Sequence, residues 1–413
     1  MSASRFIAQR LSSSKGHDDN HSRISNILAM VSVSLSIAVM IVAIAVVAGF
    51  KTQIRGKLTG FMGSTMLVQP GQGPVNESYP FADTLSYRDL ITGLKGVESI
   101  SGVAYTSGIL KTESNIEGLM FKGVDSLYNM SFFEDCLSEG ELPQYNGRIS
   151  SDIMISATTA AKLGLEVGSQ VVAYFTGDDV KVRKFKVSAI YNTGLEDIDS
   201  HFAVADIRQI RRINGWTPHE VSTIEIRSTN KADISALRDK VEEIEFCYSS
   251  DDDAALFVTG VKEIYSSLFD WLNLLDLNVL LIMILMIAVA GFNMIAAVLI
   301  ILFENISAIG LLKSLGMNNK EVGKVFQYRA GTIVGKGLIF GNLLGLAICI
   351  VQSTTHLFKL DEANYFVDSV PIALNAWHII LLNIVAAALI MLITALATRY
   401  VSKISPDKTM RVD

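Results

Sequence analysis

Charged residues are scarce in this sequence: 18% of its 413 residues are Asp, Glu, Lys or Arg, whereas 50% are hydrophobic. Four long runs contain no Asp, Glu, Lys or Arg at all: residues 24–50, 277–303, 337–358 and 369–398. Each run is long enough for a bilayer-spanning helix, which needs roughly 20 apolar residues. This pattern excludes an ordinary soluble enzyme and predicts an α-helical membrane protein with four transmembrane helices.

The usual sequence signatures of chemistry are also lacking. The nearest approach to a phosphate-binding loop, GTIVGKG at residues 331–337, is one residue short between its glycines and lacks the hydroxyl. Only His17 and His21 among the six histidines are spaced as ligands, and they lie in a polar tail. No span carries the charged residues of an ion relay. We therefore expect no catalytic residue, no bound metal or cofactor, and no internal source of energy.

Cysteine is rare as well, with Cys136, Cys247 and Cys349 only. Cys349 falls in the third span. Cys136 and Cys247 share the long segment between spans one and two, and their spacing is compatible with a disulfide or with two free thiols. The positive residues are too dispersed to form a nucleic-acid surface.

Lysine and arginine gather on one side of the expected spans. The N-terminal tail, the 304–328 loop and the C-terminal tail are rich in these residues, whereas the 355–374 loop has only Lys359. The positive-inside rule then makes both termini cytoplasmic and the segment between spans one and two extracytoplasmic. The predicted order is a cytoplasmic tail with an amphipathic elbow (1–23), span one (24–50), an outer domain (51–272), span two (277–303), a cytoplasmic loop (304–328), span three (329–354), a short outer loop (355–374), span four (375–399) and a cytoplasmic tail (400–413).

The outer domain reads as a large α+β domain in two lobes. STIEIRS (222–228) and KFKVSAIY (184–191) have the alternation and β-branched residues typical of strands. Residues 232–244 place apolar side chains at helical spacing. Ser156 is a candidate N-cap for a short helix that Gly164 would end.

Glycines repeat along the third span at Gly337, Gly341 and Gly345. Small residues four apart allow another membrane helix to approach closely, so the repeat predicts a helix-packing interface. The alternative is that glycine is simply common in membrane helices.

The stretch FENISAIGLLKSLGMN (303–318) follows the second span and is predicted to form a helix of about three turns. Gly316 is a candidate stop, and Asn318 with Glu321 a candidate cap for the next helix. The segment is either a surface hairpin that only connects two spans or an element that docks in a groove of a cytoplasmic ATPase. The candidate coupling residues are Glu304, Ser307, Gly310, Lys313, Ser314 and Gly316.

Three stretches carry a family resemblance. GFNMIAAVLIILFENISAIGLLKSLGMNNKEVGKVF (291–326) resembles the second span and coupling segment of the FtsX-like/MacB-like ABC permease superfamily. FIAQRL followed by SRISNILAMVSVSLSIAVMIVAIAVVAGFK resembles the first span of its lipoprotein-releasing, Lol-type (LolC/LolE) members. NTGLEDIDSHFAVADI (192–207) resembles a part of their outer domain. The resemblance covers nearly the whole chain and includes the order of spans and domain.

The resemblance implies a permease subunit that works by mechanotransmission. Two permease subunits, in a homodimer or a heterodimer, would join two copies of an ATP-binding subunit that holds ATP-Mg. Closure of the ATPases would push residues 304–316, and a lipidated protein would enter between spans one and two from the membrane and leave to a periplasmic carrier. The residues expected to border this lipid access are Val47, Gly49, Phe50, Leu277 and Asn278, with ordinary span-boundary residues as the alternative.

The sequence departs from the Lol-type pattern at one hairpin, and two other functions are alternatives to lipoprotein release. The hairpin at residues 175–184 lacks the proline of the carrier-gripping hairpin in one type of Lol subunit, which argues against carrier capture there. A MacB-like efflux permease usually has an ATPase fused at its N-terminus, whereas a 23-residue tail precedes span one here. An FtsX-like transmitter of signals to cell-wall hydrolases has a much smaller outer domain.

Overall fold

The computed structural model describes residues 20–75, 79–176, 179–229, 233–251, 253–304, 310, 313–314, 316–361 and 365–401. It divides into two compact units. The first comprises Met1–Lys51, Trp271–Lys359 and Ser369–Asp413, and the second Thr52–Asp270 and Leu360–Asp368. Two of the four crossings between the units, after Lys51 and before Trp271, lie inside long helices, so each of these helices contributes to both units.

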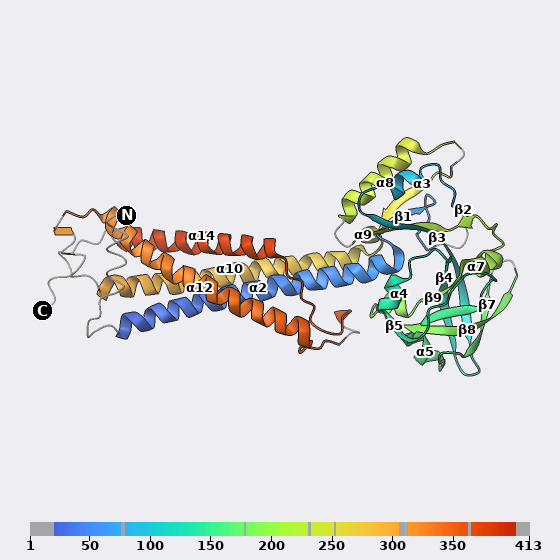
Figure 1. Cartoon of the computed structure of the whole chain (residues 1–413), viewed down its shortest axis with the longest axis horizontal. Helices are drawn as coiled ribbons and strands as arrows, with labels where there is room; N and C mark the ends of the chain where they lie inside the picture. The colour runs from blue at the N-terminus through green and yellow to red at the C-terminus, as the bar shows by residue number, and fades with distance from the viewer. Residues whose placement is uncertain are drawn as a thin grey trace. The chain divides into compact units, whose positions relative to one another are not determined.

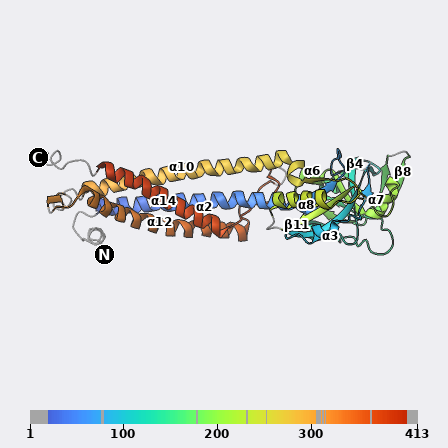
Figure 2. The same ribbon diagram turned by 90° about the horizontal axis from the view of Figure 1, so that it is seen from above.

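The first unit contains four long helices that run alongside one another (Figures 1 and 2). They are α2 (Asn20–Met62), α10 (Ser266–Glu304), α12 (Asn319–Thr355) and α14 (Ala376–Val401). Each contains a stretch that is long and apolar enough to cross a membrane. The prediction of four apolar spans is therefore confirmed.

Two helices extend beyond the charge-free runs that predicted them. α2 continues past Phe50 to Met62, and α10 begins at Ser266, before Leu277. The absence of charge marks the part of a helix that suits lipid, whereas lysine and arginine are good helix formers and do not end the helix itself. The predicted outer loop (355–374) is split between the two units, because Leu360–Asp368 belongs to the second unit. Within that unit, Lys57 Nζ donates to the Phe366 carbonyl at 2.8 Å.

The glycine repeat of α12 lies directly against α2. A Cβ atom built at Gly337 would be 2.7 Å from Val33 Cγ1, one at Gly341 would be 2.6 Å from the Ser34 carbonyl oxygen, and one at Gly345 would be 3.1 Å from Ala38 Cα. All three glycines are buried. The two helix backbones approach so closely here that no side chain fits between them.

Polar side chains join further helix pairs within the first unit. Asn342 of α12 and Asn383 of α14 exchange two amide hydrogen bonds of 2.7 and 2.8 Å. Asn293 of α10 donates to Ser32 Oγ of α2 at 2.6 Å. Such bonds are favourable in an apolar environment because the amide would otherwise be left without a partner.

The second unit is built on a mixed sheet in the order β12-β1-β11-β3-β4-β9-β6-β8-β5, with β7 pairing β3 and β8. Its strands are β1 (Thr65–Val68), β3 (Val97–Lys111), β4 (Ile116–Val124), β5 (Leu137–Gly140), β6 (Asp152–Ser156), β7 (Gln170–Phe175), β8 (Lys181–Tyr191), β9 (Phe202–Asp206), β11 (Thr223–Ser228) and β12 (Phe257–Gly260). A separate pair is formed by β2 (Phe81–Ala82) and β10 (Glu220–Val221). The long strand β3 pairs with β11 along one half and with β4 along the other, which links the two parts of the sheet.

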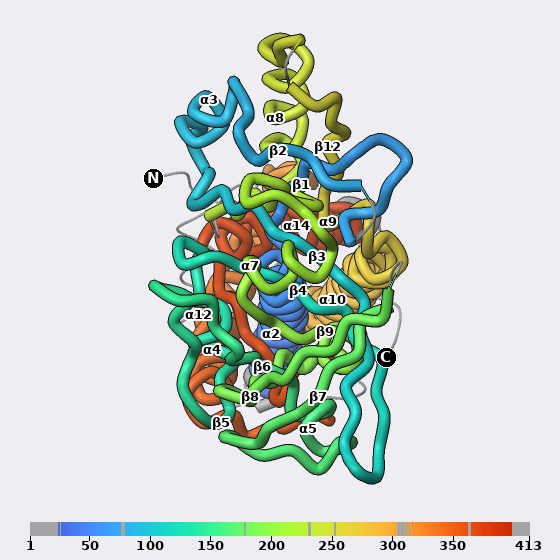
Figure 3. Tube along the Cα trace, turned by 90° about the vertical axis from the view of Figure 1, so that its right-hand side faces the viewer, coloured from blue at the N-terminus to red at the C-terminus, as the bar shows by residue number. Residues whose placement is uncertain are grey.

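Short helices cover the sheet at both ends. In Figure 3, α3 (Arg88–Thr92) and α8 (Ile234–Tyr248) lie at the end that holds β1 and β12, and α5 (Ala157–Leu163) lies at the other. The remaining helices are α4 (Ser131–Asp135), α6 (Glu196–Asp199), α7 (Ile207–Asn214) and α9 (Val261–Ile264). The mixture of α and β that the sequence predicted is confirmed.

Local capping signals explain where several elements begin and end. Ser156 Oγ accepts a hydrogen bond from the Thr159 amide, and Gly164 ends α5 with a φ of 64°, as the sequence predicted. Residues 184–191 fall on strand β8, and 223–228 of the predicted 222–228 fall on β11. α8 begins after Asp233, whose carboxylate caps it.

A single methyl group tests the contact between α2 and α12. Alanine at Gly341 would have to fit against the Ser34 carbonyl, and overpacking of this kind costs about 1–3 kcal/mol. We expect Gly341→Ala to lower the midpoint of thermal unfolding in detergent. Gly335→Ala is the matched control, because Gly335 lies on the same helix with nothing within 4 Å of its Cβ position. Equal midpoints for the two variants would contradict the close contact.

Candidate functional site

The segment predicted to couple to an ATPase is partly described. Glu304 is the last residue of α10, and its side chain and Ser307 lie outside the described residues. Gly310, Lys313 and Ser314 are helical. Gly310 is half-buried, yet in the described part of the chain nothing comes within 4 Å of the position of a Cβ there. Packing within the described chain therefore does not explain why this position is a glycine.

The end of this segment is a sharply defined turn. Gly316 has a φ of 93°, which favours glycine, and its amide donates to the Lys313 carbonyl at 3.0 Å. Asn318 then caps α12 in a capping box, in which the Glu321 side chain accepts from the Asn318 amide at 3.1 Å. The turn fixes how the chain before it leads into α12.

The predicted lipid-access residues lie where α2 and α10 are joined by an ion pair between Lys51 and Asp276. On α2, Val47 and Phe50 are half-buried; on α10, Leu277 and Asn278 are exposed. Asp276 is 62% exposed, and ion pairs at this level of exposure stabilise a structure by about 0–1 kcal/mol. The link that this ion pair makes between the two helices is therefore weak.

Gly49 has a different environment from the other four. It is buried, and a Cβ there would lie 2.3 Å from the Pro371 carbonyl oxygen, in the segment that leads into α14. The Ala373 amide donates to the Ala45 carbonyl of α2 at 3.0 Å in the same region. Gly49 thus allows the chain before α14 to cross close over α2, and it does not face α10.

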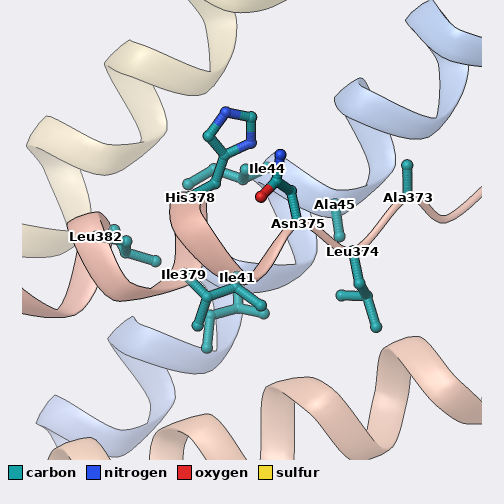
Figure 4. A pocket seen from close by; sticks show the side chains of 9 residues that line it. All are labelled: Ile41, Ile44, Ala45, Ala373, Leu374, Asn375, His378, Ile379 and Leu382. Atoms are coloured by element: carbon teal, nitrogen blue, oxygen red, sulfur yellow. The ribbon is translucent and has the colours of Figure 1, made fainter. Parts of the chain in front are cut away.

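A shallow hollow, with room for about one water molecule, opens beside this crossing. Figure 4 shows Ile41 and Ile44 of α2 together with His378, Ile379 and Leu382 of α14. Its wall is completed by Ala45, Ala373, Leu374 and Asn375. The hollow is lined mostly by aliphatic side chains, with one imidazole and one amide at its side.

A second set of residues, which sequence reasoning missed, lies at the end of α2 in the second unit. The helix ends at Met62 and leaves carbonyl oxygens without helical partners. Lys122 Nζ of β4 donates to the Phe61 carbonyl, and Arg227 Nη2 of β11 donates to the Gly60 carbonyl at 2.7 Å. Two cations thus cap the negative end of the helix dipole.

These cations belong to a buried polar network. Lys122 is fully buried and its ammonium lies 2.8 Å from the carboxylate of Glu225, which is 4% exposed. The carboxylate also accepts from Tyr105 OH at 2.9 Å and from Tyr128 OH at 3.1 Å. Lys122 donates its remaining hydrogen bond to Tyr128 OH at 2.9 Å. We name Tyr105, Lys122, Tyr128, Glu225 and Arg227 the α2 clamp.

Burial and the Glu225 charge shift the pKa values of Tyr105, Lys122 and Tyr128 in the α2 clamp. Burial lowers the pKa of the Lys122 ammonium, and the Glu225 charge opposes that shift. Burial, and then the Glu225 charge, raise the pKa of the Tyr105 and Tyr128 phenols well above the usual value. Both phenols therefore stay protonated and remain hydrogen-bond donors to the carboxylate.

The remaining sequence predictions concern one hairpin of the second unit, two cysteines and the expected lack of a bound metal. The hairpin of β7 and β8 pairs Phe175 with Lys181, and residues 177–178 of its tip lie outside the described chain. Cys136 and Cys247 are free thiols. Within the described ranges no group of three His, Cys, Asp or Glu side chains is arranged to hold a metal ion.

Two family models match the chain. The MacB-like periplasmic core domain matches residues 27–244, and the FtsX-like permease C-terminal domain matches residues 280–406. The lipoprotein-releasing system transmembrane protein LolC of Neisseria meningitidis serogroup B is 22% identical over 94% of each chain. The corresponding LolE of Haemophilus influenzae is 18% identical over 92% of each chain. The match to the crystal structure of the periplasmic region of MacB from Actinobacillus actinomycetemcomitans covers 51% of this chain and 95% of that chain at 12% identity, with a TM-score of 0.34.

Proposed function

Because the chain belongs to the family that combines a MacB-like periplasmic core domain with an FtsX-like permease domain, we propose that it is a permease subunit of an ABC transporter that extracts outer-membrane-destined lipoproteins from the inner membrane. The observation that carries this proposal is the match to a lipoprotein-releasing permease over 94% of both chains. In this role the protein is a multi-pass inner-membrane protein with both termini in the cytoplasm and its α+β unit in the periplasm.

Energy would reach the protein from outside. The partners would be two copies of an ATP-binding subunit that hold ATP-Mg, and a second permease subunit, identical or related. Residues 304–316 would be the element that the ATPases push. The lack of any described atom within 4 Å of a Cβ at Gly310 supports this, since a glycine there leaves room for a partner surface to come close.

The motion would pass along α2 and α10 to the periplasmic side. A lipidated protein would enter from the membrane lipid beside Val47, Phe50, Leu277 and Asn278, and would leave towards a periplasmic carrier. The Lys51–Asp276 ion pair closes α2 against α10 at this level. Because an exposed pair of this kind is weak, it would yield easily to a pushing ATPase.

Depletion of the protein in the producing bacterium tests the function itself. After depletion and separation of the two membranes, we expect outer-membrane lipoproteins to accumulate in the inner membrane. Re-expression of the chain is the control and should restore their normal distribution. If the lipoproteins still reach the outer membrane while drug export or cell-wall hydrolysis fails, the efflux or signalling alternative takes the place of this proposal.

The variant Gly310→Arg tests the coupling segment. The bulky cation would block close docking of an ATPase without a clash in the described part of the chain. We expect ATP-driven lipoprotein release in proteoliposomes to fall to background while the variant stays folded in the membrane. Gly118→Arg is the matched control, since Gly118 of β4 also has nothing within 4 Å of its Cβ position. Normal release by Gly310→Arg would contradict the coupling role.

A reversible cross-link tests the lipid access between α2 and α10. Lys51 and Asp276 are replaced by cysteine in a chain without Cys136, Cys247 and Cys349, and a thiol cross-linker that a reductant cleaves joins the two new thiols. We expect release to stop after cross-linking and to return after reduction.

The control for this cross-link joins α12 to α14 through cysteines at Asn342 and Asn383, which already contact each other. This link should leave release unchanged. Undiminished release by fully cross-linked Lys51/Asp276 protein would show that the substrate does not pass between α2 and α10.

A further inference from the structure

The last turn of α2 is held sterically as well as electrostatically. Phe61 is fully buried, with ring centroids 6.0 Å from Phe133 and 5.1 Å from Phe202. Gly60 is so close to Phe132 that a Cβ there would lie 2.2 Å from its ring. Aromatic groups therefore surround the helix end at van der Waals distance, while Lys122 and Arg227 bind its carbonyls.

The chain leaves α2 by a short and fixed connection to the sheet. Gly63 has a φ of 80°, and a Cβ there would lie 3.0 Å from the Ile226 carbonyl oxygen. The Ser64 amide donates to that same carbonyl at 2.9 Å. β1 then begins at Thr65 and pairs with β11, the strand that carries Glu225 and Arg227. No flexible linker separates the helix from the sheet.

The chain that leads to α10 leaves the sheet beside this connection. β12 pairs with β1, with Thr65 opposite Gly260, and the Val261 amide donates to the Ser64 carbonyl at 3.2 Å. Tyr265, just before α10, places its hydroxyl 3.5 Å from Met62 Sδ. The two long helices that contribute to both units are therefore joined to neighbouring strands.

A buried ion pair is a poor device for stability alone. The cost of removing two charges from water offsets much of their attraction, and apolar replacements of similar volume are often equally stable. Lys122 and Glu225 instead contribute directional hydrogen bonds. Each donor of the ammonium and both carboxylate oxygens have a hydrogen-bond partner, so the geometry of the network is fixed. The pair fixes the orientation of the last turn of α2 on the sheet.

We propose that the α2 clamp is the rigid joint through which movement of α2 is transmitted to the periplasmic sheet, with Lys122 and Glu225 as its positioning residues. This inference rests on the proposed function for its use in transport, but the rigidity of the joint stands apart from the identity of the cargo. A displacement of the end of α2 moves β4 and β11 with it, since Lys122 and Arg227 bind the helix end from these strands. β1 follows through its pairing with β11.

Distances between spin labels test the rigidity directly. One label is attached at Gly56→Cys on α2, where no described atom lies within 4 Å of the Cβ position. The other is attached at Ile116→Cys on β4, because the Ile116 side chain is 62% exposed. The three native cysteines are replaced. In the complete complex with its ATPase, we expect one narrow distance that is the same without nucleotide and in the ATP-trapped state. A second distance that appears with ATP would overturn the proposal.

The double variant Lys122→Met/Glu225→Gln tests the positioning role. It removes both charges, so neither is left unpaired, and glutamine still offers Tyr105 an acceptor. We expect normal ATP hydrolysis. Lipoprotein release per ATP should fall by a factor of about five or more, which is the size of effect typical for the loss of a coupling between two sites. The same label pair should show a broadened distance in this variant.

The matched control is Lys162→Met/Glu117→Gln, the same change in a partly exposed ion pair of 2.6 Å between α5 and β4. It should leave release per ATP and the label distance unchanged. A folded clamp variant with unchanged release per ATP and an unchanged distance would overturn the proposal. If the unmodified complex releases no lipoprotein at all, the proposed function fails, and the label distances still decide whether the joint is rigid.

Discussion

The end of α2 is capped from inside a β-sheet, and much of the molecule depends on that contact. A helix normally ends in water, where solvent satisfies its last carbonyls. Here Lys122 and Arg227 satisfy them from strands β4 and β11. The last turn of α2 is thereby fixed to the sheet.

The features that sequence predicts well are local ones. The charge-free runs located all four apolar helices, because lipid tolerates no unpaired charge. Ser156 and Gly164 marked the ends of α5 because a cap and a left-handed stop act within one turn. The capping box of Asn318 and Glu321 was visible for the same reason. In each case the signal and its partner lie within a few residues.

The α2 clamp was missed because its partners are far apart in sequence. Lys122 and Glu225 are separated by 103 residues, and Lys122 and Phe61 by 61. In STIEIRS the alternation suggested one apolar and one polar face, yet Thr223, Glu225 and Arg227 are buried too. A charge inside such a strand is a usable signal for a buried network, but only the topology shows which residue will neutralise it. The continuation of α2 past Lys51 was hidden in a similar way, since charge ends a membrane run without ending a helix.

Hydrogen exchange at the last turn of α2 tests the central claim most directly. If the helix end is locked into the sheet, the amides of Leu58, Phe61 and Met62 in the full-length protein exchange as slowly as those of Tyr105 and Phe121 in the central strands β3 and β4. Both groups then become exposed only when the whole unit opens. Fast exchange at the end of α2 while the strands remain protected would show that the helix frays independently of the sheet, and would contradict the account.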